Sequence, residues 1–167
     1  MLSSENPGSG WKTNGLAAAL ALVLLAGCQA RPLYGTISGE KQSVSVSVAD
    51  SRVEQTVRNE LVLGFGGEQQ DSAYRLELSV SSRIAGILPG GVDNEFSAAR
   101  ATVTANYKLK MAATGEIIKS GSRFADAQLD LPSQQFAQVR AKLEAEDRAA
   151  RAVAALVRAD IAAALAR

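Results

Sequence analysis

The fold is decided by RATVTANYKLKMAATGEIIKSGSRFADA, residues Arg100–Ala127. Its first part, Arg100–Ala112, alternates apolar and polar side chains, which is the period of a strand with one buried face. Thr114-Gly115 then supplies a hairpin turn, and an extended pattern resumes over Glu116–Ala127. The stretch therefore predicts a long β-hairpin whose apolar face must be covered by another layer.

The polar faces of this hairpin carry four basic side chains. They are Lys108 and Lys110 on the first strand, and Lys119 and Arg123 on the second. Directly opposed residues of antiparallel strands lie roughly 5 Å apart, so the four can form a basic patch for an anionic ligand. The alternative is a solvated strand face, on which lysine discourages aggregation between sheet edges.

The residues before the hairpin predict two more strands and a helix. Ser43–Ala49 alternates serine with valine, and Tyr74–Ser81 alternates apolar with polar residues, as half-buried strands do. Between them, Ser51 and Glu54 form a capping box, and an apolar stripe every four residues predicts a helix of about 13 residues. Residues 84–99 are expected to be a long, partly apolar loop that either folds over its own sheet or contacts a partner or lipid.

The C-terminal region predicts one long helix, from Ser133 to Arg167. Nothing in it breaks a helix, and one apolar stripe runs from Phe136 to Leu165. The stripe weakens at Glu146 and Asp147, where we expect a curve or a solvated section. The element order is then β-α-β-β-β-α, which predicts an α+β fold: a two-layer sandwich with two helices on a four-stranded mixed sheet.

The N-terminal region contains LAAALALVLLAGC, residues Leu16–Cys28, and Cys28 is the only cysteine of the chain. The apolar run is shorter than the roughly 20 residues that span a bilayer and fits the apolar region of a signal peptide. Its last four residues, LAGC, resemble the lipobox of bacterial lipoproteins. That resemblance implies cleavage before Cys28, diacylglycerol on its thiol and a further acyl chain on the new amine. Gln29, which replaces the aspartate of inner-membrane retention, favours the outer membrane.

These signals divide the chain into three parts. Residues 1–27 are predicted to be a signal peptide, residues 28–42 a lipidated tether, and residues 43–167 a single α+β domain. The domain is large enough to bury its own core and needs no disulfide.

Composition excludes several classes of function. The chain has no histidine, which excludes Ser-His-Asp and Cys-His catalysis and histidine-based metal sites. Its 18 Lys and Arg and 17 Asp and Glu nearly balance, which gives no support for nucleic-acid binding. Paired carboxylates could still act as acid and base, but no pair of acids is singled out by the sequence. We therefore expect that the protein is not an enzyme and has no cofactor, apart from covalent lipid on Cys28.

Several short motifs together resemble the LptE family of LPS-assembly lipoproteins, in its alphaproteobacterial form. The most specific is RPLYG at Arg31–Gly35, directly after the lipobox and similar to the GCxFRPLYG start of that group. The others are Ala99-Arg100 at the start of the long strand, the turn Thr114-Gly115-Glu116, Phe136-Ala137 and the run Glu144–Arg151.

The resemblance implies an outer-membrane lipoprotein that faces the periplasm and sits as a plug in the lumen of an LptD-type β-barrel. It also implies that the protein binds lipopolysaccharide (LPS), helps the barrel to assemble and contacts outer-membrane lipid through its acyl chains. No LPS-contacting motif of the family matches here, so Lys108, Lys110, Lys119 and Arg123 rest on hairpin geometry alone. The alternative function is an auxiliary lipoprotein of an ABC or MCE-type envelope lipid transport system, also a small α+β domain behind a lipobox.

Overall fold

The computed structural model describes residues 43–69, 71–89 and 96–166, all within one compact unit. Its elements are β1 (Val44–Val46), α2 (Arg52–Gly64), β2 (Tyr74–Pro89), β3 (Phe96–Met111), β4 (Ile117–Asp130) and α3 (Gln135–Leu165). The strands form one sheet in the order β1-β2-β3-β4, with β1 parallel to β2 and the other pairs antiparallel. The predicted α+β fold and element order are confirmed. The predicted signal peptide and tether, residues 1–27 and 28–42, lie outside the described residues.

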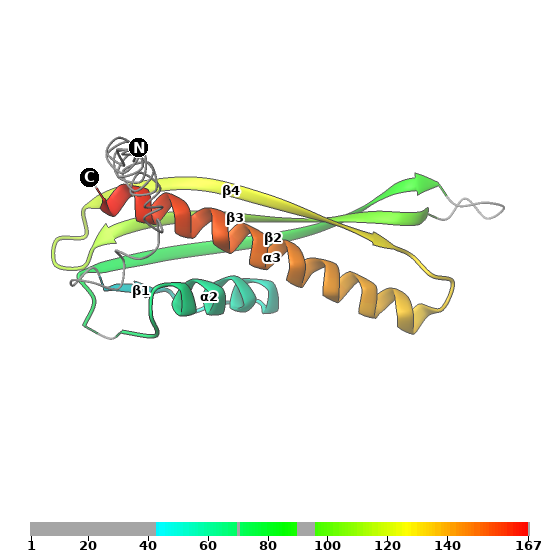
Figure 1. Ribbon diagram of the computed structural model, residues 1–167, viewed down its shortest axis with the longest axis horizontal. Coiled ribbons are helices and arrows are strands. Elements are labelled where there is room, and N and C mark those ends of the chain that lie inside the picture. The colour runs from blue at the N-terminus through cyan, green and yellow to red at the C-terminus, as the bar shows by residue number, and fades with distance from the viewer. Residues whose placement is uncertain (1–42, 70, 90–95, 167) are drawn as a thin grey trace, which may run out of the picture. The chain divides into compact units, whose positions relative to one another are not determined.

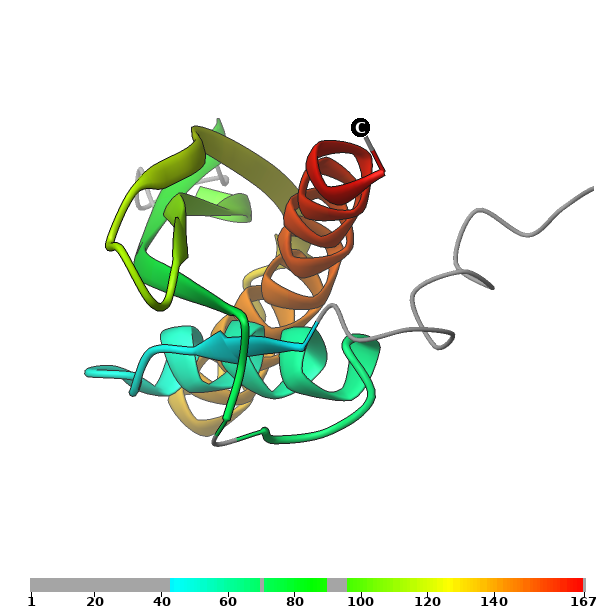
Figure 2. The same cartoon turned by 90° about the vertical axis from the view of Figure 1, so that its left-hand side faces the viewer.

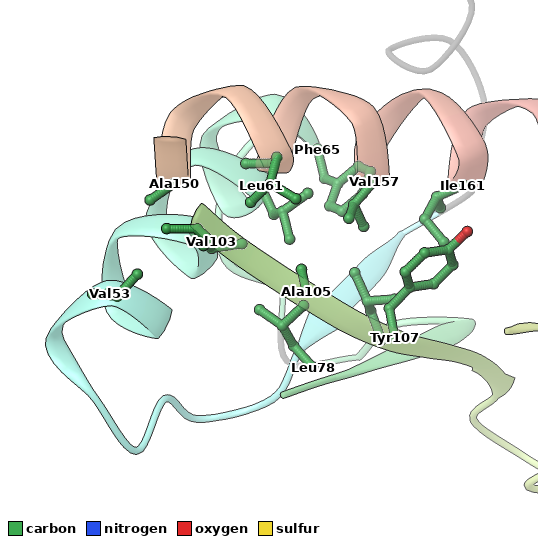
Figure 3. Close-up of a cluster of buried hydrophobic side chains, with 14 of the residues drawn as sticks. Val53, Leu61, Phe65, Leu78, Val103, Ala105, Tyr107, Ala150, Val157 and Ile161 are labelled. Atoms are coloured by element: carbon green, nitrogen blue, oxygen red, sulfur yellow. The ribbon is translucent and has the colours of Figure 1, made fainter. Parts of the chain in front are cut away.

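Both helices pack on the same face of the sheet and on each other (Figures 1 and 2). Helix α3 contacts β3 and β4, whereas α2 contacts β1 and β2. The main core lies between the helices and the sheet, where Leu61 and Phe65 of α2 face Val157 of α3 (Figure 3). Burying these apolar side chains is the main favourable term that joins the two layers.

Helix α2 begins at its predicted cap, but only half of the capping box forms. The Ser51 hydroxyl oxygen accepts a hydrogen bond from the Glu54 N–H at 3.2 Å. The Glu54 carboxylate does not return to the cap; it accepts a hydrogen bond from the Val80 N–H of β2 at 3.2 Å. Glu54 is buried, so this bond satisfies a charge that the core would otherwise leave unpaired.

Strand β1 is shorter than the predicted Ser43–Ala49, because the chain leaves the sheet after Val46. The Ser47 N–H still donates to the Leu76 carbonyl at 2.9 Å, and the Ser47 hydroxyl accepts from the Leu78 N–H at 3.1 Å. The side chains of Ser47 and Glu54 thus accept hydrogen bonds from N–H groups of β2 that lie beyond the end of β1. This protects an edge that would otherwise be free to pair.

The expectation of an irregular loop over residues 84–99 is wrong. Strand β2 continues to Pro89 and β3 begins at Phe96, so most of this segment forms a two-stranded arm. Register shifts near Gly86, Leu88 and Pro89 break the simple alternation that reveals a strand in the sequence. The ring of Phe96 lies over Gly86, where an added Cβ would come within 2.2 Å of it.

Helix α3 matches its predicted extent within two residues at each end. The expected weak point at Glu146 and Asp147 is where α3 meets the start of α2. Arg52 donates to both carboxylates at 2.6 Å, and the Ser82 hydroxyl donates to Glu146 at 2.7 Å. The two acids therefore join α3 to α2 and β2.

Candidate functional site on the open face of the sheet

The side of the sheet turned away from the helices, here called the open face, carries mainly polar side chains of the alternating strands. Phe124 of β4, which lies opposite Thr104, is an exposed apolar residue among them. The register brings side chains of β2, β3 and β4 together in rows across this face. Many of them are hydroxyl or amide groups: Ser79, Ser81, Thr102, Thr104, Asn106, Ser120 and Ser122. Neither described helix covers this face (Figure 2).

A shallow groove of about 610 Å³ crosses the open face and is lined by residues of all three long strands. Its polar side chains are Glu77, Ser79, Asn106, Lys108, Ser120 and Ser122. Lys108 is exposed and forms no ion pair within the described part of the chain. A cation among hydroxyl groups is suited to a phosphorylated or polyhydroxylated ligand.

Lys110 lies beside this groove but is already paired. Its ammonium group donates to the Glu77 carboxylate at 2.6 Å. That hydrogen bond is the main reason why the pKa of Glu77 is lowered from its ordinary value. Lys110 therefore holds Glu77, which also lies directly opposite Lys108. Lys108 makes no ion pair of its own in the described part of the chain and remains exposed in the groove.

The four predicted basic residues do not share one face. Lys119 lies directly opposite Leu109 and Arg123 opposite Ala105, so both are on the side of the helices. Lys108 and Lys110 alternate with Leu109 on β3 and lie on the open face. The structure thus brings Lys108 and Lys110 together and separates them from Lys119 and Arg123.

Arg123 belongs to a polar cluster that fastens α3 to the sheet. Its guanidinium group donates to both carboxylate oxygens of Asp160, at 2.6 and 2.8 Å. The Tyr107 hydroxyl also donates to Asp160, at 2.6 Å. The Arg123 hydrogen bond is the largest cause of a lowered pKa for Asp160, despite its partial burial. The cluster therefore has a structural role.

We predict that Gly121→Val will break this cluster. A Cβ at Gly121 would lie 2.5 Å from the Tyr107 hydroxyl oxygen, so the ring must leave Asp160. Losing a hydrogen bond to a charged group costs about 1.5–3 kcal/mol, and we expect this loss in the free energy of unfolding measured with urea. Ser122→Val, one residue along on the open face, is the control and should change stability by less than about 0.5 kcal/mol. Equal effects would contradict the proposed contact.

A second prediction concerns Tyr107 at alkaline pH. Burial, followed by its hydrogen bond to Asp160, raises the pKa of Tyr107 to about 12. The unfolded chain ionises near its ordinary pKa of about 10, so the contribution to stability is complete below about pH 10 and is lost as pH rises toward 12. The stability difference between the wild type and Tyr107→Phe should shrink over that range in urea titrations. A difference that is independent of pH would refute this assignment.

Three further cations of the open face were not among the predicted site residues. The register places Arg75 opposite Lys110, and it places Arg83 and Arg100 on the same face toward the far end of the sheet. Arg100 makes only a 4.0 Å ion pair with Asp126. The alternation of the two predicted strands could have identified Arg75 and Arg100. Arg83 lies beyond the predicted strand Tyr74–Ser81, so it required the extension of β2 that the structure shows.

The described residues contain no group of three or more acidic, cysteine or histidine side chains arranged to hold a metal ion. Among the same residues, no helix combines the length and apolar character needed to cross a bilayer.

Comparison with solved structures shows the same fold in other bacterial lipoproteins. A lipoprotein from Caulobacter crescentus, described as putative, aligns with a TM-score of 0.64 and 21% identity over 80% of this chain and 96% of its own. Rare lipoprotein B from Shewanella oneidensis aligns with a TM-score of 0.56 and 12% identity over 76% of this chain and 97% of its own. A minor lipoprotein from Acinetobacter baumannii aligns with a TM-score of 0.55 and 13% identity over 74% of this chain and 90% of its own.

No curated protein matches the chain significantly in sequence. The sequence model of one family does match, over residues 41–161, and its description is LptE, lipopolysaccharide-assembly. This match includes all four strands, α2 and all but the last four residues of α3, and it covers well over half of the chain. The chain therefore belongs to the LptE family of lipopolysaccharide-assembly lipoproteins, which are not enzymes.

Proposed function

We propose that this protein is an outer-membrane lipoprotein of the LPS transport and assembly machinery, anchored by lipid on Cys28. In this role it occupies the lumen of an LptD-type β-barrel, assists assembly of that barrel and binds LPS on its way to the outer leaflet. The observation that carries the proposal is the uncovered, polar face of the sheet with its groove around Lys108. The family to which the chain belongs supplies the LPS-assembly context.

The polarity of the open face suits a plug. The interior wall of an outer-membrane barrel is polar, and rows of hydroxyl and amide groups can exchange hydrogen bonds with such a wall. The opposite face of the sheet is already covered by α2 and α3 and holds the core. A domain whose core is already closed on one face of the sheet can therefore place the other, mainly polar face against the wall of a barrel lumen without unfolding.

Co-purification tests the partner directly. We expect the affinity-tagged lipoprotein, solubilised in mild detergent, to recover a large outer-membrane barrel, and we expect its depletion to remove LPS from the cell surface and leave the barrel misassembled. Recovery with an inner-membrane ABC or MCE-type complex in place of the barrel would overturn the proposal in favour of a lipid-transport auxiliary.

Charge reversal on the two faces of the hairpin tests the LPS contact. Lys108→Glu should weaken LPS binding about 10-fold or more, because it replaces a charge-assisted contact worth roughly 1.5–3 kcal/mol by a repulsion. Lys119→Glu is the matched control, since it makes the same change on the opposite face of the same hairpin. Binding of purified LPS to the folded variants is the measurement. Equal affinities in the two variants would exclude the groove as the LPS site.

A further inference from the structure

Helix α3 is longer than α2, the helix that packs against it. It spans 31 residues, whereas α2 spans 13, and the first residue of α2, Arg52, meets α3 at Glu146 and Asp147. Beyond this point toward the C-terminus, the apolar stripe of α3 is buried: Ala150, Val153, Val157 and Ile161. Toward the N-terminus, α3 continues past the end of α2, and we call Gln135–Leu143 the α3 overhang (Figure 1).

The α3 overhang carries the same stripe without its cover. Phe136 is 79% exposed, Val139 48% and Leu143 36%. Their spacing of three and four residues places them on one side of the helix. Another side of the helix faces the sheet, where Ala141 of the overhang and Ala145 just beyond it pack near Ala99 and Leu129. The exposed stripe is thus a second apolar surface of α3, separate from the side that holds the sheet.

Charge distinguishes the overhang from the rest of α3. Residues 131–143 contain two cations, Arg140 and Lys142, and no acidic residue. At 3.6 residues per turn, Arg140 lies roughly 70° to one side of the stripe and Lys142 roughly 90° to the other. An aromatic and two aliphatic residues flanked by cations form the pattern of a helix that lies in a membrane interface, where the cations reach the headgroups.

We propose that the α3 overhang docks on an anionic phospholipid leaflet, with Phe136, Val139 and Leu143 in the headgroup–acyl boundary and Arg140 and Lys142 on lipid phosphates. The inference rests on the proposed lipid anchor at Cys28, which confines the domain to a membrane surface. The 14 residues from Gln29 to Gln42 span at most about 50 Å when extended, which is enough for the domain to lie against that leaflet. The acyl chains proposed on Cys28 are sufficient for stable anchoring, so the contact made by the overhang would set how the domain lies on the leaflet.

The apolar character of the stripe argues against the wall of the barrel lumen as the partner of this surface. A lumen wall is polar, so an apolar stripe would remain incompletely buried there, whereas a leaflet buries it and pairs both cations. The open face of the sheet, with its hydroxyl rows, fits the polar wall better. The α3 overhang is therefore suited to a lipid leaflet, and the open face of the sheet is suited to the polar wall of a barrel.

The only cysteine provides a clean experiment. In the lipidated chain the Cys28 thiol is consumed by its thioether, so Val139→Cys introduces one free thiol for a bimane label. Leu156→Cys is the matched control, because Leu156 is similarly exposed (45%) but lies on the solvent side of the covered part of α3. The full lipidated chain is reconstituted in vesicles of phosphatidylethanolamine and phosphatidylglycerol that contain nitroxide-labelled lipid.

We expect nitroxide quenching at position 139 to be several-fold stronger than at position 156, and to fall to the control level in Arg140→Glu/Lys142→Glu. Equal quenching at the two positions overturns the docking. Shielding of position 139 that requires a co-reconstituted barrel also overturns it, because the stripe would then be a protein contact. Two bimane labels per chain by mass spectrometry would instead show that Cys28 is unmodified, a separate failure of the proposed anchor.

Discussion

Replacing Leu61 by alanine is expected to lower the free energy of unfolding by about 3 kcal/mol, within the 2–5 kcal/mol typical of buried leucine. Leu61 is fully buried and lies in the core between α2, α3 and the sheet (Figure 3). The substitution removes its transfer free energy and leaves a cavity that neighbours on two helices and β3 cannot fill without moving. For a domain of this size, such a loss is a large share of the total stability.

Leu63→Ala provides the control on the same helix. Leu63 is 74% exposed, so the same change of side chain should alter the free energy of unfolding by less than about 0.5 kcal/mol. Both variants can be compared by urea unfolding followed by far-UV circular dichroism, with an unchanged m-value as the test of two-state behaviour. A similar midpoint for both variants would mean that α2 does not pack on α3 as described.

The sequence predicted the layers well because each signal it used is local. The period-two pattern of β3 and the stripe of α2 depend on neighbours within one turn or one strand, and both are confirmed. The arm formed by the ends of β2 and β3 was missed for the same reason. Its register shifts and its contact between Phe96 and Gly86 are relations between strands, which no local pattern contains.

The basic patch shows the same limit at the candidate site. Alternation correctly grouped Lys108 with Lys110 and Lys119 with Arg123. What it could not give is the register across the turn, which contains an irregularity between Leu109 and Lys110. A shift of one residue moves every side chain of a strand to the other face, so the two pairs were joined in expectation and are separated in the structure.

Partners within the fold also change what a charged residue can do. Arg123 and Lys110 were equal candidates with Lys108 in the sequence. The structure shows Arg123 bound to Asp160 and Lys110 bound to Glu77, which leaves Lys108 as the cation of the groove. Asp160 lies 37 residues beyond Arg123, and Glu77 lies 33 residues before Lys110, so neither pair could be identified from spacing.

Cys28→Ala is expected to abolish membrane anchoring completely. Without the thiol no diacylglycerol can be attached, and loss of a lipid that contributes about 0.8 kcal/mol per buried CH₂ exceeds anything that the α3 overhang can replace. Labelling cells with an alkyne analogue of palmitate should therefore give a labelled band for the wild type and none for the variant. The variant should also fail to reach the outer-membrane fraction.

Gln29→Ala is the matched control, because it changes the neighbouring residue and leaves the acceptor thiol in place. It should retain the palmitate label, so a loss in Cys28→Ala alone assigns the lipid to the thiol and not to the surrounding sequence. Label that persists in Cys28→Ala would show that another group is acylated, and the anchor, the tether and the membrane orientation proposed for α3 would all have to be reassigned. Because Cys28 is the only cysteine of the chain, no second thiol can mask the result.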